Sequence, residues 1–292
     1  MFFLDNLING LSLGSIYAII ALGYTMVYGI AKMLNFAHGD VIMVGAYIAF
    51  CGLQYCGLPP LLAFLVAMAV CTVLGITIEG LAYRPLRQAA SLAVLITAIG
   101  MSYLLQNTAL MIWGANPNFF PSTFINSSTL HLGALNIPIA TLITILANIV
   151  IMVILTLFTA KTKMGKAMRC VSEDRGAAEL MGINVNRTIS VTFAIGSALA
   201  AIAGVLLCSS YPILQPTTGS MPGIKAFTAA VFGGIGSIPG AMLGGVLLGV
   251  IEIFGKAYIS TELGDAIVFA VLIVVLLVKP SGLLGKPVRE KV

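Results

Sequence analysis

Residues 161–187 read KTKMGKAMRCVSEDRGAAELMGINVNR and form the one stretch of this chain in which charged residues gather. Nine charged residues lie in it, out of 15 Lys or Arg and 10 Asp or Glu in the whole chain. The remaining sequence is almost free of charge, and 59% of all residues are apolar. Helices of a soluble protein keep one polar face, so this composition excludes a soluble domain and indicates an integral membrane protein.

A short helix is expected inside this charged stretch. Ser172 or Asp174 can cap its first turn, and Gly182 stands where a residue in the left-handed region commonly ends a helix. Apolar and charged residues are mixed between these points, which suits a helix lying against a protein partner or a headgroup layer. A solvated connector is the alternative, because charged loops beside membrane spans are common.

Nine apolar runs divide the rest of the chain. A span takes ~20 apolar residues, so the 292 residues hold about eight spans and leave no soluble domain. We therefore predict an all-α polytopic membrane protein with about eight or nine transmembrane helices, some short or broken, in a single domain over residues 1–292. The runs are 9–31, 41–58, 61–83, 91–113, 137–160, 189–209, 224–232, 240–254 and 265–278.

The basic residues predict the orientation. Twelve of the fifteen Lys and Arg residues fall in three groups, which the positive-inside rule places in the cytoplasm. Counting spans then puts the N-terminus outside, the C-terminus inside, and loop 114–135, which has no Lys, Arg, Asp or Glu, outside. An odd number of crossings must follow residue 209, and we expect three. The groups are Arg84 with Arg87, the stretch 161–187, and the tail with Lys279, Lys286, Arg289 and Lys291.

Two stretches interrupt the apolar pattern: NFAHGD at residues 35–40 and GGIGSIPG at residues 233–240. Backbone leaves the helix inside a membrane only where protein or a water-filled cavity satisfies its polar groups, so such breaks often mark a transport path. The first stretch is expected to supply polar gate residues facing the second. The alternative is a plain turn at the inner face, with these residues and Lys32 in water. The gate candidates are Asn35, His38, Asp40, Gly233, Gly234, Gly236 and Pro239.

Five further polar residues lie within apolar runs. Each is costly in lipid unless it faces the bundle interior or a cavity. Glu79 stands close to Arg84 and is expected to form an interfacial pair with it. Gln106 and Asn107 lie deeper and are candidates for the lining of the path, with interhelical hydrogen bonding as the alternative. The remaining two are Asn148 and Glu252.

Within the apolar runs, glycine recurs at four-residue spacing in three places. The pairs are Gly10 with Gly14, Gly240 with Gly244, and Gly245 with Gly249. Small residues at this spacing let membrane helices approach closely. The pattern predicts tight helix packing.

Enzyme readings have no residues to support them. The sequence has no G-x-x-x-x-G-K-[ST] or H-E-x-x-H motif. Its two histidines and five scattered cysteines lack metal-ligand spacing, so we expect no catalytic residue, no metal site and no cofactor held by this chain. The net charge of +5 does not indicate a nucleic-acid partner, because the basic residues lie beside apolar spans.

Six blocks in fixed order carry a resemblance that runs almost end to end. The chain resembles the permease subunit of the bacterial high-affinity branched-chain amino acid ABC importer, the Leu/Ile/Val system. The blocks are GLSLGSIYAIIALGYTMVYGI (10–30), NFAHGD (35–40), YRPLR (83–87), ITAIGMSYLLQN (96–107), MGKAMRCVSEDRGAAELMGIN (164–184) and KAFTAAVFGGIGSIPGAMLGG (225–245).

The resemblance implies a transmembrane subunit in the bacterial inner (cytoplasmic) membrane. Such a subunit moves branched-chain amino acids into the cytoplasm from a periplasmic binding protein, beside a related second permease and two cytoplasmic ATPase subunits that hold ATP and Mg. It also implies a cytoplasmic coupling loop at residues 161–188, although the spacing departs from the E-A-A signature of other importers. The loop residues expected to matter are Arg169, Glu173, Asp174, Arg175, Glu179 and Gly182.

Two rival functions stay open at this point. A self-sufficient secondary carrier or channel should hold titratable groups at mid-membrane, whereas this chain gathers most of its charge in loop 161–187. A purely structural membrane scaffold predicts that no change in that loop affects transport.

Overall fold

The computed structural model describes residues 2–121, 129–132 and 135–285. Within these residues the chain is almost entirely helical, with four short strands in two small sheets. The helices are α1 (Phe2–Ala31), α2 (His38–Gln54), α3 (Pro60–Ile78), α4 (Ser91–Trp113), α5 (Ile139–Lys161), α6 (Lys163–Glu173), α7 (Arg175–Leu180), α8 (Val185–Ser210), α9 (Ser220–Gly233), α10 (Ile238–Tyr258) and α11 (Gly264–Val278). The strands are β1 (Asn118–Phe119), β2 (Thr129–Leu132), β3 (Leu135–Pro138) and β4 (Ile213–Leu214), and β1 pairs with β4 and β2 with β3, both antiparallel.

Each of the nine apolar runs forms one helix, which confirms the prediction of an all-α polytopic membrane protein. In the described part of the chain six helices are long and apolar enough to cross a membrane. They are α1, α3 with its extension to Leu86, α4, α5, α8 and α10. The helices α2, α9 and α11 have only 17, 14 and 15 residues, in agreement with the prediction of some short helices. The run 240–254 was also expected to be short, but its helix α10 has 21 residues and is one of the six long helices.

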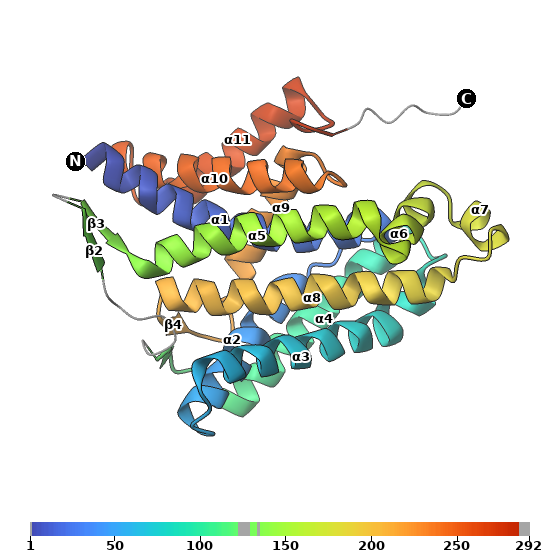
Figure 1. Cartoon of the computed structure of the whole chain (residues 1–292), viewed down its shortest axis with the longest axis horizontal. Helices are drawn as coiled ribbons and strands as arrows, with labels where there is room; N and C mark the ends of the chain where they lie inside the picture. Colours follow the sequence, from blue (N-terminus) through green and yellow to red (C-terminus); the bar gives the residue numbers. More distant parts are fainter. Residues whose placement is uncertain (1, 122–128, 133–134, 286–292) are drawn as a thin grey trace.

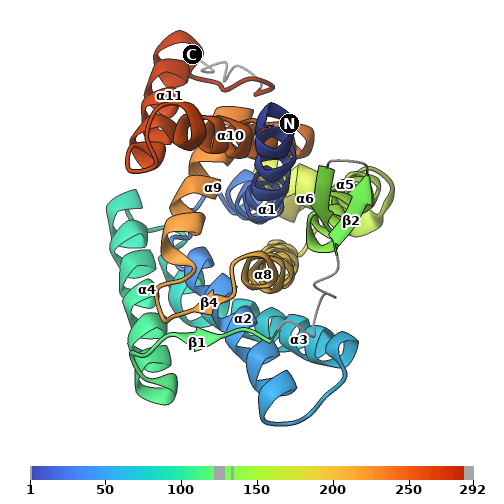
Figure 2. The same ribbon diagram turned by 90° about the vertical axis from the view of Figure 1, so that its left-hand side faces the viewer.

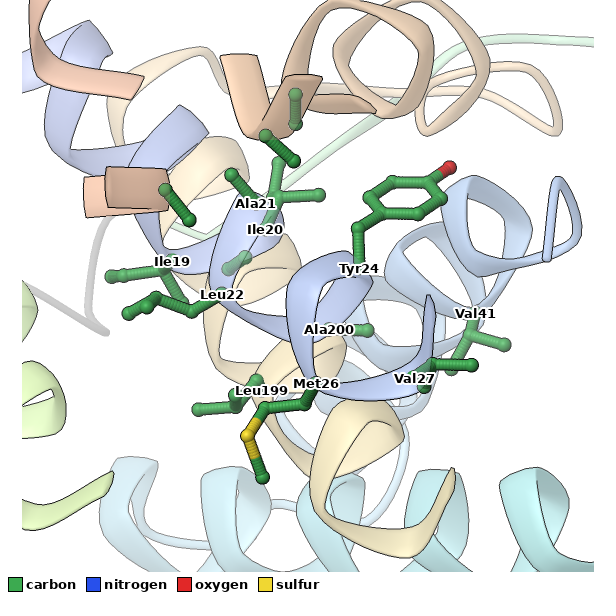
Figure 3. Packing of buried hydrophobic residues seen from close by; sticks show 14 of the residues in the cluster. Ile19, Ile20, Ala21, Leu22, Tyr24, Met26, Val27, Val41, Leu199 and Ala200 are labelled. Atoms are coloured by element: carbon green, nitrogen blue, oxygen red, sulfur yellow. The ribbon is translucent and has the colours of Figure 1, made fainter. Parts of the chain in front are cut away.

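Helix α1 is the centre of the bundle. In its most apolar window 89% of the residues are buried, against 11% for α4, which is a peripheral helix. Figure 2 shows α1 nearly end-on, with α5, α8, α9 and α10 around it. Figure 3 shows side chains on several sides of α1 in contact with other helices: Val27 lies near Val41 of α2, and Met26 near Leu199 of α8.

Glycines bring α1 and α10 into direct backbone contact. A methyl group added at Gly249 would overlap the backbone of Gly14, and one added at Gly245 would overlap Ala18. Two of the three glycine pairs noted in the sequence, Gly10 with Gly14 and Gly245 with Gly249, therefore form the contact between these two helices, whereas Gly240 and Gly244 pack on α9. Apolar side chains gain little by leaving lipid for protein, so such close van der Waals contact is what holds membrane helices together.

The basic groups of the described residues gather at one end of the bundle, which we call the basic end. Arg87 donates a hydrogen bond to the start of α8, and Arg175 donates one to the carbonyl oxygen of Ala31 at the end of α1. The chain after α11 returns to this end, where the amide of Leu284 donates to the carbonyl of Gly233 at 3.0 Å. Figure 1 shows α6 and α7 at this end and the strands at the opposite end. This grouping is what the predicted topology requires.

Overfilling the α1–α10 contact should destabilise the fold. Gly249→Leu places a large side chain where backbone atoms of α1 already lie, and overpacking costs about 1–3 kcal/mol or more. We expect a lower temperature of aggregation for the detergent-solubilised protein, measured by size-exclusion chromatography after heating. The matched control is Gly100→Leu, because Gly100 on α4 is exposed and has open space around it. Equal stability of the two variants would contradict the packing role.

Thiol labelling tests the orientation. The topology places positions 84, 87, 163 and 289 in the cytoplasm and positions 118 and 127 outside, although 127 and 289 are not among the described residues. Two exposed native thiols lie at opposite ends, Cys56 after α2 and Cys170 in α6. In variants that keep one thiol, a membrane-impermeant maleimide should label Cys56 in intact cells and Cys170 only after permeabilisation. Labelling of Cys170, or of Lys163→Cys, from outside would contradict the predicted orientation.

Candidate translocation path and coupling loop

The segment between α1 and α2 turns back into the bundle. The imidazole of His38 lies against Gly23, eight residues before the end of α1. At 1.5 Å per helical residue, α2 therefore begins about 12 Å inside the basic end. Asn35, His38 and Asp40 are 5%, 1% and 1% exposed. The alternative of a wet turn is therefore wrong for these three residues, and in 32–40 only Lys32 is exposed.

His38 is a packing residue in this structure. Its ring fills the space left by Gly23, where a methyl group would lie 2.6 Å from Nε2, and it makes an edge contact with Tyr24 at 4.6 Å between centroids. It is held between α1 and α8. The expectation that His38 faces the glycine-rich break is therefore wrong. The sequence could not show this, because nothing in it places Gly23 opposite His38.

Asp40 belongs to a polar cluster that joins three helices. Gln106 Nε2 of α4 donates to Asp40 Oδ1 of α2 at 2.8 Å, and lies 3.2 Å from the hydroxyl oxygens of Ser102 and Ser220. Asp40 has no cationic partner among the described residues. Its position in the first turn of α2 lets the helix N-terminus stabilise a carboxylate. A buried ionisable group at this depth is a functional candidate by default.

The structure separates the two polar neighbours on α4. Gln106 is half-buried and points to Asp40, whereas Asn107 is exposed and donates to the carbonyl of Tyr103 in its own helix at 2.7 Å. A place for Asn107 in the lining of the path stays a prediction. Gln106 remains a candidate, and it also makes the interhelical hydrogen bond that was the alternative.

The glycine-rich break forms the turn between α9 and α10. Gly233 packs on Gly240, Gly236 approaches Gly29 of α1, and Gly234 has a φ of +104° that favours glycine. Pro239 lies in the first turn of α10, which Ser237 caps through a hydrogen bond from Gly240 N at 3.2 Å. These contacts explain the residues locally. A role in the path stays a prediction for all four candidates here.

Only the beginning of the NFAHGD segment reaches this turn. Asn35 and Ile235 line the same small cavity, of about 10 Å³. Further along the segment, Gly39 instead meets the start of α9, where a methyl group at Gly223 would lie 2.8 Å from its Cα. The element that faces Asp40 is thus the N-terminus of α9 and not the turn that follows this helix.

Two polar contacts fix the basic end of α3. Glu79 pairs with Arg87 and accepts a hydrogen bond from Ser190 of α8 at 2.6 Å. The expected partner, Arg84, is exposed, so the sequence-based pairing is wrong. Residues Glu79–Tyr83 form a turn of π-helix, which changes the direction of the following side chains, and such turns are frequent at functional sites. Tyr83 at its end donates to Asn35 at 2.9 Å.

The sequence analysis missed an ion cluster between helices, in which Lys225 and Glu252 are buried and Lys256 and Asp265 are partly exposed. Lys225 of α9 lies 2.7 Å from Glu252 of α10 and 2.6 Å from Asp265 of α11. Glu252 also pairs with Lys256 and accepts a hydrogen bond from Tyr17 of α1 at 2.9 Å. The charges balance within the cluster, which reduces the cost of burying them. The signal available was a single lysine in the apolar run 224–232.

The charged loop forms two short helices. Thr162 caps α6, whose existence we did not predict, and Asp174 caps α7 by accepting from Ala177 N at 3.0 Å. Gly182 follows with a φ of +79°, so the predicted helix and both of its end signals are confirmed. Leu180 and Met181 are 91% and 83% exposed.

Arginines attach this loop to the bundle. Arg169 donates to the carbonyl of Ala160 at 3.0 Å, and Arg175 donates to that of Ala31. Burial lowers the pKa of the Arg175 guanidinium, and the positive charge of Arg87 lowers it further. Glu173 and Glu179 are exposed, and their carboxylates form no ion pair with another described residue.

Comparison with known proteins decides the family. The family model described as "Branched-chain amino acid transport system / permease component" matches residues 6–276. The chain belongs to this family. The permease is 46% identical to the high-affinity branched-chain amino acid transport system permease protein LivH of Escherichia coli (strain K12), over 100% of this chain and 98% of LivH. It is also 46% identical to BraD of Pseudomonas aeruginosa, over 99% of this chain and 98% of BraD.

More distant proteins share parts of the sequence or the fold. The ribose import permease protein RbsC of Haemophilus influenzae is 28% identical over 86% of the permease and 77% of RbsC. A chain of the solved PsaBC complex from Streptococcus pneumoniae, bound to a Fab, matches the fold with a TM-score of 0.51 at 15% identity. The match covers 96% of the permease and 93% of the PsaBC chain. With its family and its apolar helices, the permease is a multi-pass inner-membrane protein.

The polar cluster provides a test of the gate hypothesis. If Asp40 and Gln106 handle the passing substrate, Asp40→Asn and Gln106→Leu should lower uptake several-fold at normal membrane levels of the permease. Asn107→Leu is the matched control, because this neighbour points away from the cluster. Uptake and ATP hydrolysis should be measured together in reconstituted vesicles. Wild-type uptake and ATP hydrolysis in the first two variants would contradict the gate hypothesis. His38→Ala is unsuitable, since it would open a cavity in the core.

Proposed function

We propose that this permease is the transmembrane subunit of an ATP-driven importer that moves branched-chain amino acids from a periplasmic binding protein into the cytoplasm. Its partners are a related second permease and two cytoplasmic ATPase subunits, which bind ATP and Mg and carry out the hydrolysis. The observation that carries the proposal is the family match over residues 6–276, together with full-length relatives that are named as permeases of this transport system.

The shape of the charged loop supports the coupling role. Helix α7 projects from the basic end with Leu180 and Met181 exposed at its end, beside the charged side chains of the same loop. Exposed apolar residues rimmed by charge are typical of a protein contact. The caps at Asp174 and Gly182 give the element defined ends. A small rigid helix of this kind suits a docking site for an ATPase subunit.

The interior supports passage of an aliphatic zwitterion. A branched side chain must be passed without being trapped, which calls for an apolar path with few polar groups. The cluster of Asp40, Gln106 and Ser220 offers one carboxylate and neutral donors among apolar helices. Such a cluster can receive the ammonium group of an amino acid.

One observation favours the rival function of a secondary carrier. The cluster of Lys225, Glu252 and Asp265 places titratable groups inside the bundle, where coupling to an ion gradient would need them. The charges in it are mutually paired, as a structural network requires. A carrier would transport without any ATPase, so dependence on ATP separates the two functions.

Replacing residues 173–179 with a Gly/Ser linker tests the proposal. Insertion should be unchanged, because the spans insert by their own hydrophobicity, whereas uptake of leucine should be lost with α7. The matched control replaces residues 259–262, the turn between α10 and α11 at the opposite end, with the same linker. Membrane level and thiol labelling report correct insertion. Uptake retained by the inserted 173–179 variant would contradict the coupling role.

A further inference from the structure

A hollow of about 610 Å³ lies at the basic end, apart from the polar cluster at Asp40. Its walls come from the end of α1, the turn between α3 and α4, and the junction of α6 with α7. The volume falls within the ~300–1,000 Å³ range of small-molecule sites. The hollow therefore touches both the bundle and the loop assigned to coupling.

One part of the wall is apolar. The residues of this part come from the end of α1 and the start of α4, and from the segments that follow and precede them. They are Tyr28, Met33, Leu34, Leu86, Val94 and Leu95. Aliphatic and aromatic side chains of this kind favour an aliphatic ligand group, because its burial removes apolar surface from water.

The rest of the wall carries charges of both signs. Arg87 is paired with Glu79, Arg175 binds the carbonyl of Ala31, and Asp174 caps α7. Two lining residues are left without a described partner, the cation Lys32 and the anion Glu173, and both are exposed. Both charges are therefore available to a ligand.

The backbone holds Lys32 in an unusual conformation. Its φ is +53°, and it is the one non-glycine residue with a positive φ in the described chain. Such a conformation is uncommon for a residue other than glycine and persists only where the surroundings determine it. It places the lysine at the rim of the hollow, directly after the end of α1.

From this geometry we infer that the hollow binds a free α-amino acid with a branched aliphatic side chain at the basic end. The α-carboxylate pairs with Lys32, the α-ammonium with Glu173, and the side chain contacts the apolar wall. The ligand class rests on the proposed function, which makes the same amino acids the cargo. Because Glu173 lies at the α6–α7 junction, a bound amino acid ties the coupling loop to α1. Amino acid accumulated in the cytoplasm then slows the importer.

Binding is measured on the purified full-length permease in lipid nanodiscs, by calorimetric titration with L-leucine. 4-Methylpentanoate, which is leucine without the ammonium group, and 3-methylbutylamine, which is leucine without the carboxylate, serve as probes of the two charges. We expect each probe to bind roughly tenfold or more weakly than leucine, because each loses one charge-assisted contact. Equal binding of leucine and both probes would overturn the assignment of the charges.

Point variants connect the binding to the hollow. Lys32→Gln and Glu173→Gln remove one charge each from exposed side chains without a described partner, so neither should impair folding. Each should weaken leucine binding roughly tenfold or more. The charge-matched controls are Lys166→Gln in α6 and Glu262→Gln at the opposite end, both exposed and outside the hollow. Unchanged binding in the two hollow variants, or an equal loss in the controls, would overturn the site.

The effect on transport is measured in vesicles that contain the whole importer. Leucine loaded on the side of α7 should slow ATP hydrolysis in the wild-type complex, and Lys32→Gln should raise the half-inhibiting concentration roughly tenfold. Absence of leucine uptake in the wild-type vesicles would contradict the proposed function. Normal uptake without inhibition by internal leucine would leave that function intact and overturn the feedback.

Discussion

The close contact between α1 and α10 is the interaction on which the rest of the bundle depends. Burying apolar surface against protein gains little in a lipid environment, so these helices hold together by approaching until their backbones touch at Gly14 and Gly249. The contact fixes α1 as the axis of the structure. Gly23 of the same helix then receives His38, and Gly29 receives the turn at Gly236. One helix thereby positions both interruptions of the apolar pattern.

Polar groups inside the bundle show a second constraint. A charge in this region must find partners within the protein, and two buried carboxylates, Glu252 and Asp40, find them in different ways. Glu252 is satisfied by two lysines and Tyr17, which ties α1, α9 and α10 together. Asp40 is satisfied by neutral donors and a helix N-terminus alone. The first arrangement is complete as it stands, whereas the second leaves a carboxylate able to accept a cationic group. This contrast is why the proposed path runs past Asp40.

The sequence predicted the features that depend on local patterns. The apolar runs predicted nine of the helices, and Asp174 with Gly182 predicted the ends of α7, because length, hydropathy and capping are local properties. Lys225 was missed because its partners belong to other helices. Glu79 was paired with the wrong arginine because the π-turn rotates the side chains that follow it. Depth in the bundle cannot be read from the sequence, and it is the property that decided the assignment of His38.

The charged residues differ between the inside of the bundle and its basic end. The membrane region holds few ionisable groups, each with partners, while the basic end holds the loop of α6 and α7 with exposed apolar and charged side chains. Such an end is suited to receive force from a soluble partner. The same end holds the hollow beside Lys32, so a ligand there can act on the loop without entering the path.

Co-purification tests the central claim, that α7 docks an ATPase subunit, most directly. The tagged permease is extracted in mild detergent at native expression level, and the bound proteins are identified by mass spectrometry. The account predicts that the wild-type chain brings an ATPase subunit with it and that Leu180→Asp combined with Met181→Asp loses this subunit while the protein stays in the membrane. A wild-type chain that transports leucine with no ATPase attached, or a double variant that keeps it, would contradict the account.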